Sequence, residues 1–253
     1  IIVRHPGAGF GGKRGFHYEA HVAALARTAR RPVRLVFSRR EEFTAPDRRR
    51  EGIGFDFETG VKADGTITAR RVRLVLDNGA YTADAGFFSQ IACMHALGPY
   101  RMDNVHAEAH LVYTNHQPSG SVRAPTAPQC CWAVESHTDE VARAIGMDPV
   151  AFRRHNAVDS GVEGPSGQTY GEIGLQQCID AATEMAGYGG PLADDEAIGV
   201  AIAWWPSFSS PAGAYVKIDG DGSGQIITGA QECGTGAVMT LRQLAADELG
   251  MRP

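Results

Sequence analysis

Near the start of the chain, the residues from Gly7 to Lys13 form a glycine-rich turn of a kind that binds anions. Read as G-x-G-x-x-G, the turn uses Gly7, Gly9 and Gly12, the pattern of dinucleotide folds. Read as G-x-x-x-x-G-K, it ends at Lys13, but a P-loop needs Ser or Thr next, where Arg14 stands. Because glycines let backbone N–H groups approach an anion closely, the turn predicts an anionic cofactor.

Two further loops of small residues each precede a predicted helix. Arg123 lies in the loop Ser-Gly-Ser-Val-Arg-Ala-Pro-Thr-Ala-Pro-Gln, residues 119–129, where its forked donors suit a phosphate or an oxyanion. Residues 232–236, Glu-Cys-Gly-Thr-Gly, precede the last predicted helix, whose first N–H groups also suit an anion. Three such loops suggest one large anionic ligand that is held at several points.

Three other patterns are interpreted as structural. The segment Asp219 to Gly224 resembles half of an EF-hand loop but lacks its terminal glutamate, so we expect a hairpin turn. His17 and His21 are one helical turn apart, yet no third metal ligand is placed by the sequence. The adjacent Cys130 and Cys131 are expected to be small buried residues.

The composition is that of a globular protein, with 43% hydrophobic and 21% charged residues in 253. A net charge of -5 argues against nucleic-acid binding, and the basic run at residues 39–40 and 48–50 is interpreted as a strand end or a salt-bridged interface. Five cysteines without a C-x-x-C pair predict no disulfide framework and no metal cluster, which fits a reducing, cytoplasmic location. No apolar run is long enough to cross a membrane.

Hydrophobic periodicity predicts both helices and strands. Residues 22–29 have helical spacing, and residues 33–37 alternate as a strand, which completes a β-loop-α-β start. The alternation in residues 53–76 around Asp64-Gly65 predicts a long antiparallel hairpin, which a doubly wound sheet would not contain. Residues 105–113 are expected to form a strand.

The second half of the chain continues this mixture. Helices are predicted at about residues 129–145, 149–154 and 238–249, and strands at 198–204, 212–218 and 225–229. Breakers and acids in residues 187–196 predict a boundary between a first domain, residues 1–190, and a second, residues 191–253. The fold class expected is α+β.

Four motifs in order give the chain a family resemblance: Gly-Ala-Gly-Phe-Gly-Gly-Lys, Val-Arg-Ala-Pro-Thr-Ala-Pro-Gln, Gly-Met-Asp-Pro-Val-Ala-Phe-Arg-Arg-His-Asn and Gly-Ala-Gln-Glu-Cys-Gly-Thr-Gly. In this order the chain resembles the molybdenum-binding large subunit of the xanthine dehydrogenase, aldehyde oxidase and carbon monoxide dehydrogenase family. The resemblance implies a molybdopterin-binding α+β fold with mixed sheets, packed helices and two subdomains. It also implies a molybdenum pyranopterin in the cytosine dinucleotide form and hydroxylation with oxygen from water.

The resemblance also implies site residues. Those expected to bind the cofactor are Gly9, Phe10, Gly11, Gly12, Arg123, Ala124, Gly234, Thr235 and Gly236. Phe10 and Arg123 are expected near the molybdenum, without being side-chain ligands. The substrate pocket is expected at Arg14, Pro125, Trp204 and Trp205.

Departures from the family pattern narrow the range of expected substrates. Arg14 replaces an acid of purine-oxidising members, which argues against xanthine, and residues 120–129 lack the copper-binding cysteine of carbon monoxide dehydrogenases. Thr235 stands where Gln is usual. The catalytic glutamate of the family is expected beyond Pro253, so no catalytic residue is assigned within the chain, and part of the first domain is expected to precede Ile1.

The family further implies partners: an iron–sulfur subunit with 2Fe–2S clusters and an FAD-binding subunit, assembled as a dimer of heterotrimers. The substrate expected is a small aldehyde, N-heterocycle or aromatic, with neither nucleic acid nor membrane as partner. One alternative is an NADP-binding Rossmann domain, with residues 38–40 at the 2′-phosphate. Another is an inactive remnant or assembly subunit.

Overall fold

The computed structural model describes residues 7, 9–14, 18–44, 49–206 and 211–253. The chain forms two compact units, one made of Ser38–Trp205 and the other of Ile1–Phe37 with Pro206–Pro253. The strand-like first residues and His17 lie outside the described part of the chain.

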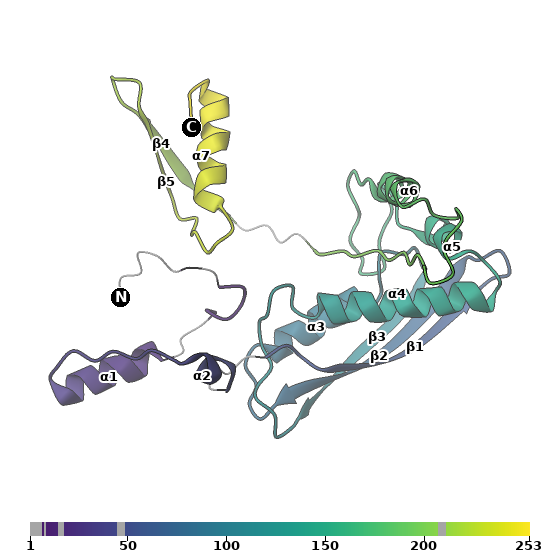
Figure 1. Cartoon of the computed structure of the whole chain (residues 1–253), viewed down its shortest axis with the longest axis horizontal. Helices are drawn as coiled ribbons and strands as arrows, with labels where there is room; N and C mark the ends of the chain where they lie inside the picture. The colour runs from purple at the N-terminus through teal and green to yellow at the C-terminus, as the bar shows by residue number, and fades with distance from the viewer. Residues whose placement is uncertain (1–6, 8, 15–17, 45–48, 207–210) are drawn as a thin grey trace. The chain divides into compact units, whose positions relative to one another are not determined.

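A three-stranded sheet forms the centre of the unit Ser38–Trp205 (Figure 1). Strands β1 (Ile53–Val61) and β2 (Ile67–Gly79) pair antiparallel, which confirms the predicted hairpin. Strand β3 (Asn104–Tyr113) pairs parallel with β2, so β2 is central. Burial alternates along β1, as expected for a sheet with one covered face.

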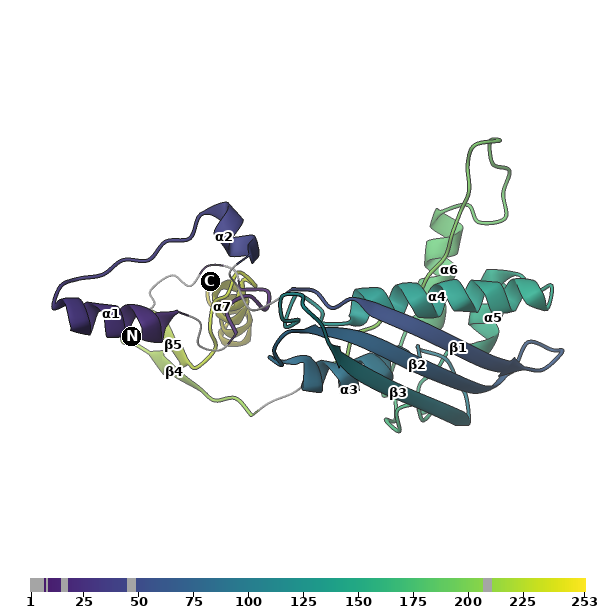
Figure 2. The ribbon, with the colours of Figure 1, turned by 90° about the horizontal axis from the view of Figure 1, so that it is seen from below.

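Two helices, α3 (Ala85–His95) and α4 (Ala127–Ala144), cover one face of this sheet (Figure 2). The buried core between sheet and helices contains Val72, Leu74, Leu76, Ala92, Ala96 and Cys130. Cys130 is fully buried, as predicted, and burial raises the pKa of its thiol. The sequence did not predict α3, because no side chain caps its start and Gly86 lies in its first turn.

Helices α5 (Pro149–Asn156) and α6 (Leu175–Met185) follow α4. The Asp148 carboxylate accepts hydrogen bonds from the backbone N–H groups of Val150 (3.0 Å) and Ala151 (2.8 Å), so the predicted cap of α5 is confirmed. The start of α6 was missed, because it is preceded by Gly174 and has no side-chain cap.

The segment Ile198 to Trp204 was predicted as a strand, and this was wrong: it has no regular secondary structure and pairs with no strand among the described residues. It is held instead by the buried carboxylate of Glu135 on α4, which accepts a hydrogen bond from the backbone N–H of Ile202 (2.9 Å). The same carboxylate accepts hydrogen bonds from Tyr100 Oη (2.6 Å) and Arg153 Nε (2.8 Å). A side chain therefore replaces the backbone partner that a strand would need.

The other unit contains α1 (Glu19–Ala29), the antiparallel pair β4 (Ala214–Ile218) and β5 (Gly224–Thr228), and α7 (Ala237–Leu249). The predicted hairpin turn is confirmed, since the N–H of Asp219 donates to the carbonyl of Ser223 (2.8 Å).

The expected strand at residues 33–37 does not form, and helix α2 (Arg39–Thr44) follows these residues. Without that strand, the β-α-β unit of the Rossmann alternative is not formed in the described part of the chain. None of the described helices has the length and apolar character that crossing a membrane requires.

Candidate functional site

The loop 119–129 has an unusual backbone at the residues predicted to meet the cofactor. Ala124 and Thr126 have positive φ angles of 53° and 64°, although neither is glycine. Such residues cost roughly 1–3 kcal/mol each and persist where the surroundings fix them, which occurs most often at functional sites. Thr126 is fully buried, whereas Arg123 is exposed. The loop is therefore fixed at its base and open at Arg123.

His95, at the end of α3, contacts this loop. Its Nδ1 lies 3.3 Å from the hydroxyl of Thr126, and the imidazole is fully buried. Burial lowers the pKa of His95 to about 4, so the ring is neutral at neutral pH. A neutral ring nitrogen suits the hydroxyl contact without introducing a buried charge.

The predicted pocket tryptophans lie against the same histidine. The ring centroids of His95 and Trp204 are 4.9 Å apart in an edge-to-face arrangement, and those of His95 and Trp205 are 5.2 Å apart and stacked. His95 thus brings together two sets of residues that the sequence predicted separately, the loop with Arg123 and Pro125 and the Trp204–Trp205 pair. The indole of Trp205 is 45% exposed, so an aromatic face is open beside this loop.

Two buried nitrogen atoms at this place have no hydrogen-bond partner among the described residues, His95 Nε2 and Trp204 Nε1. Buried polar groups are nearly always paired, so these atoms are suited to bind a polar group of a ligand or a water molecule. The backbone of Trp204 also lies beside Cys131 of α4, and burial raises the pKa of that thiol.

The glycine-rich turn belongs to the other unit and is held by local hydrogen bonds. The N–H of Gly12 donates to the carbonyl of Gly9 (2.9 Å), and that of Arg14 to the carbonyl of Gly11 (3.2 Å). Phe10 has a φ of 48°, and its side chain is half exposed. A left-handed phenylalanine at the tip of a glycine turn is a strained and exposed feature, which fits a role in binding.

The turn 234–236 is held by the carboxylate of Glu232. Glu232 Oε1 accepts hydrogen bonds from the N–H groups of Gly234 (2.7 Å) and Gly236 (3.0 Å), and Oε2 from that of Val238 (3.3 Å). These hydrogen bonds lower the pKa of Glu232. The donors that were predicted to meet a cofactor anion, next to Thr235, are therefore already bound to an anion within the chain.

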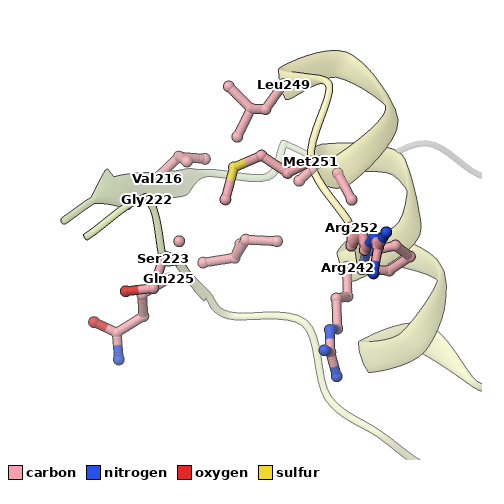
Figure 3. A pocket seen from close by; sticks show the side chains of 13 residues that line it. Val216, Gly222, Ser223, Gln225, Arg242, Leu249, Met251 and Arg252 are labelled. Atoms are coloured by element: carbon pink, nitrogen blue, oxygen red, sulfur yellow. The ribbon is translucent and has the colours of Figure 1, made fainter. Parts of the chain in front are cut away.

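A cavity of about 460 Å³ lies between the β4–β5 pair and α7 (Figure 3). Its lining is mainly apolar, with Val216, Leu249 and Met251 at the wall, and includes Arg242 and Arg252. None of the predicted cofactor or substrate residues lines it.

These observations define an α+β protein with strained loops of small residues, one of which lies beside the exposed indole of Trp205. A family model described as "Molybdopterin cofactor-binding domain" matches residues 1–157, and a second model of the same description matches residues 180–253. The chain belongs to the molybdopterin cofactor-binding domain family. The match confirms the predicted family and fold class. It also confirms that the family binds a molybdenum–pterin cofactor and consists of oxidoreductases.

Similar proteins and similar solved structures support the same family assignment. The chain is 35% identical over 187 residues to the nicotinate dehydrogenase large molybdopterin subunit of Eubacterium barkeri, covering 74% of this chain and 44% of the relative. It is 29% identical over 266 residues to a putative xanthine dehydrogenase molybdenum-binding subunit of Escherichia coli K12, covering 99% and 35%. Quinoline 2-oxidoreductase from Pseudomonas putida 86 has a TM-score of 0.78 at 25% identity, covering 95% and 34%. The chain thus spans less than half the length of these relatives.

Sequence reasoning missed His95 and Arg50, which contact the Arg123 loop from elsewhere in the chain, and Glu135, which holds the segment before Trp204. The basic run around Arg50 was interpreted as a strand end or a salt-bridged interface, and in the structure Arg49 forms an ion pair with Asp77 (2.5 Å) within the chain. No sequence signal marked His95, because the helix that carries it was not predicted.

Proposed function

We propose that the chain forms part of the large subunit of a molybdenum hydroxylase that hydroxylates an N-heterocyclic substrate, with water as the source of oxygen. The observation that carries the proposal is the convergence of the strained Arg123 loop and the Trp204–Trp205 pair on His95. An open indole face suits a planar heteroaromatic ring, and an unpaired buried nitrogen suits its ring nitrogen or hydroxyl.

The names of similar proteins support this substrate class. Besides the nicotinate and quinoline enzymes, the chain is 30% identical to the nicotine 6-hydroxylase large subunit of Paenarthrobacter nicotinovorans, covering 99% of this chain and 34% of the relative. Nicotinate, nicotine and quinoline all contain an aromatic nitrogen heterocycle. An aldehyde is the second candidate, because the chain also resembles the aldehyde oxidoreductase structure from Desulfovibrio gigas, with a TM-score of 0.73 at 26% identity over 87% of this chain and 25% of that one.

In this proposal, the chain's own residues bind and orient the cofactor. The guanidinium of Arg123 would donate to an anionic oxygen of the bound cofactor, and the backbone of Ala124 would contact the pterin. Phe10, in the turn Gly9 to Gly12, would lie near the bound molybdenum through its backbone. When bound, the molybdenum pyranopterin supplies a two-electron oxidation of the substrate carbon.

The turn Gly234 to Gly236 is proposed to contact the pterin through its N–H groups. Because the Glu232 carboxylate accepts hydrogen bonds from two of these groups, a cofactor oxygen at the turn must replace it as acceptor. Arg14 and Pro125 are proposed to line the substrate side.

We further propose the cytosine dinucleotide form of the pterin, electron transfer through 2Fe–2S clusters to FAD in companion subunits, and a dimer of such heterotrimers. A cytoplasmic location is supported by the five cysteines, none of which is in a disulfide. The predicted division at residue 190 and a catalytic glutamate beyond Pro253 belong to the same proposal.

The test uses the holoenzyme purified from its native host with its companion chains. We expect stoichiometric molybdenum, iron in the companions, and oxidation of quinoline or nicotinate with a dye as acceptor. In water enriched with oxygen-18, the hydroxyl oxygen of the product should carry the label. Benzaldehyde oxidised in preference to both heterocycles would establish the second candidate, and a metal-free protein would contradict the proposal.

Two variants test the site. Arg123→Lys is expected to lower kcat by about 100-fold, the typical loss when one charge-stabilising donor is removed. Arg73→Lys is the matched control, because Arg73 lies on the polar face of the sheet, where it pairs with Asp56 (3.2 Å) and Glu108 (3.8 Å). Equal activity of the two variants would refute the role of Arg123.

A further inference from the structure

The segment 49–51 runs alongside the start of the Arg123 loop. The N–H of Arg49 donates to the carbonyl of Pro118 (3.0 Å), and the N–H of Gly120 donates to the carbonyl of Arg49 (3.1 Å). Arg49 itself donates from Nε to the carbonyl of Gln117 (2.7 Å). This backbone pairing fixes the next residue, Arg50, beside the loop.

The guanidinium of Arg50 binds two consecutive carbonyl groups of the loop. Its Nη2 donates to the carbonyl of Arg123 (2.6 Å), and its Nη1 to the carbonyl of Ala124 (3.1 Å). Ala124 is one of the two non-glycine residues of the loop with a positive φ. A planar fork with donors in fixed positions fits two adjacent acceptors, whereas a lysine ammonium lacks this geometry.

Gln129 connects Arg50 to the buried part of the unit. Its Oε1 accepts from Arg50 Nη1 (3.4 Å), and its Nε2 donates to the backbone carbonyl of Glu51 (2.9 Å) and to Glu51 Oε2 (3.3 Å). Glu51 is only 3% exposed. The Arg50 guanidinium that binds the strained loop is therefore also linked, through Gln129, to the buried Glu51.

We propose that Arg50 is a positioning residue, which orients Arg123 and Pro125 toward the cofactor by holding the carbonyl groups of Arg123 and Ala124. This inference rests on the proposed function, since it takes Arg123 to act at the molybdenum. Arg50 acts through the backbone and contacts neither metal nor substrate. Loss of its fork frees the left-handed Ala124 and changes the direction in which the Arg123 side chain leaves the loop.

The test compares Arg50→Lys with Arg101→Lys in the holoenzyme and in the cofactor-free protein. Both variants keep the charge and both lose an arginine that binds a backbone carbonyl, but Arg101 binds the carbonyl of His155 (2.7 Å), outside the Arg123 loop. In the cofactor-free protein we expect faster amide hydrogen exchange in residues 119–129 for Arg50→Lys only, by about 10-fold. That readout is independent of the metal.

In the holoenzyme, Arg50→Lys should retain its molybdenum, show an altered Mo(V) electron paramagnetic resonance signal, and lose kcat by about 10- to 100-fold with KM little changed, as expected for a small misplacement. Arg101→Lys should keep the wild-type signal and kcat. Arg50→Lys with wild-type exchange, signal and kcat would overturn the proposal. If Arg50→Lys does not fold, Gln129→Leu gives the same test with a smaller expected change.

Failure of this inference can be told apart from failure of the proposed function. If Arg123→Lys changes the Mo(V) signal and kcat while Arg50→Lys does not, only the role of Arg50 is refuted. If Arg123→Lys changes neither, the proposed site is wrong, and the role of Arg50 is refuted with it.

Discussion

The Arg123 loop and the turn 234–236 show two ways of fixing a loop that precedes a helix. The Arg123 loop is held by Arg50 and His95, which are far from it in sequence. The turn 234–236 is held by Glu232, which lies within the same short segment. The first conformation therefore depends on the folding of its whole unit, whereas the second depends on local hydrogen bonds.

The largest effect is expected at Glu135, which fixes the segment leading to Trp204. Glu135→Gln should lower the free energy of unfolding by about 3 kcal/mol, because it removes the more buried of the two carboxylates that pair with Arg153 and disturbs the hydrogen bonds from Tyr100 and Ile202 to the same carboxylate. Chemical denaturation measures the loss. Glu58→Gln is the control, because its ion pair with Arg71 (2.5 Å) is exposed and should be worth less than about 1 kcal/mol. Equal losses would show that the buried network does not hold this unit.

Gly79 and Gly236 have nearly equal φ angles, 77° and 78°. Substitutions at these two glycines therefore allow a direct comparison of the unit that contains the Arg123 loop with the turn 234–236. A methyl group on Gly79 would overlap the carbonyl oxygen of Gln117, whereas one on Gly236 would meet nothing within 4 Å. Gly79→Ala should therefore cost about 3 kcal/mol, the sum of the left-handed penalty and the overlap, and Gly236→Ala about 1 kcal/mol. Thermal unfolding of both variants checks the difference. Similar losses would mean that the backbone angle alone decides.

The buried His95 should make the stability of the unit Ser38–Trp205 depend on pH. Because burial lowers the pKa of His95 to about 4, the unfolded chain binds a proton between about pH 6.5 and pH 4 that the folded chain does not. Stability should therefore fall as the pH falls through this window, by about 1.4 kcal/mol per pH unit from this group.

The variant His95→Phe, which cannot titrate, should show a shallower fall in stability over the same window. The measurement is the free energy of unfolding at several pH values between 4 and 7. Parallel curves for the two proteins would exclude His95 as the titrating group. The slope is compared rather than the absolute stability, since the variant also loses the contact with Thr126.

The smallest effect is expected at Glu232. Its hydrogen bonds to backbone N–H groups lower its pKa, so its contribution to stability is present above the ordinary pKa of glutamate and is lost as the pH falls. Glu232→Gln should lower the thermal midpoint only slightly and leave the stability of the unit Ser38–Trp205 unchanged. A large loss, or any change in amide exchange of residues 119–129, would show that the two loops are not independent.

Local sequence patterns predicted much of this fold. The β1–β2 hairpin follows from the alternation around Asp64-Gly65, and α5 from Asp148 followed by proline. The helix α4 and the β4–β5 turn were predicted in the same way. Family resemblance, and not spacing, assigned Arg123 and Trp204 to one site.

The elements that were missed or wrong depend on distant partners. Residues 33–37 and 198–204 alternate like strands, but a strand forms only where another strand provides hydrogen bonds, and here none does among the described residues. The helices α3 and α6 lack side-chain caps, so contacts with the rest of the unit stabilise them.

By itself, the sequence determined the class of the fold and the glycine and arginine loops, because turn geometry and hydrophobic period are local properties. Only the tertiary structure decided that His95 joins the Arg123 loop to the tryptophans, and that Arg50 and Glu135 hold the backbone around them. The physical reason is that a buried polar group takes whichever partner the packed chain places beside it, and residues separated by about 30 to 75 positions carry no local signal of that pairing.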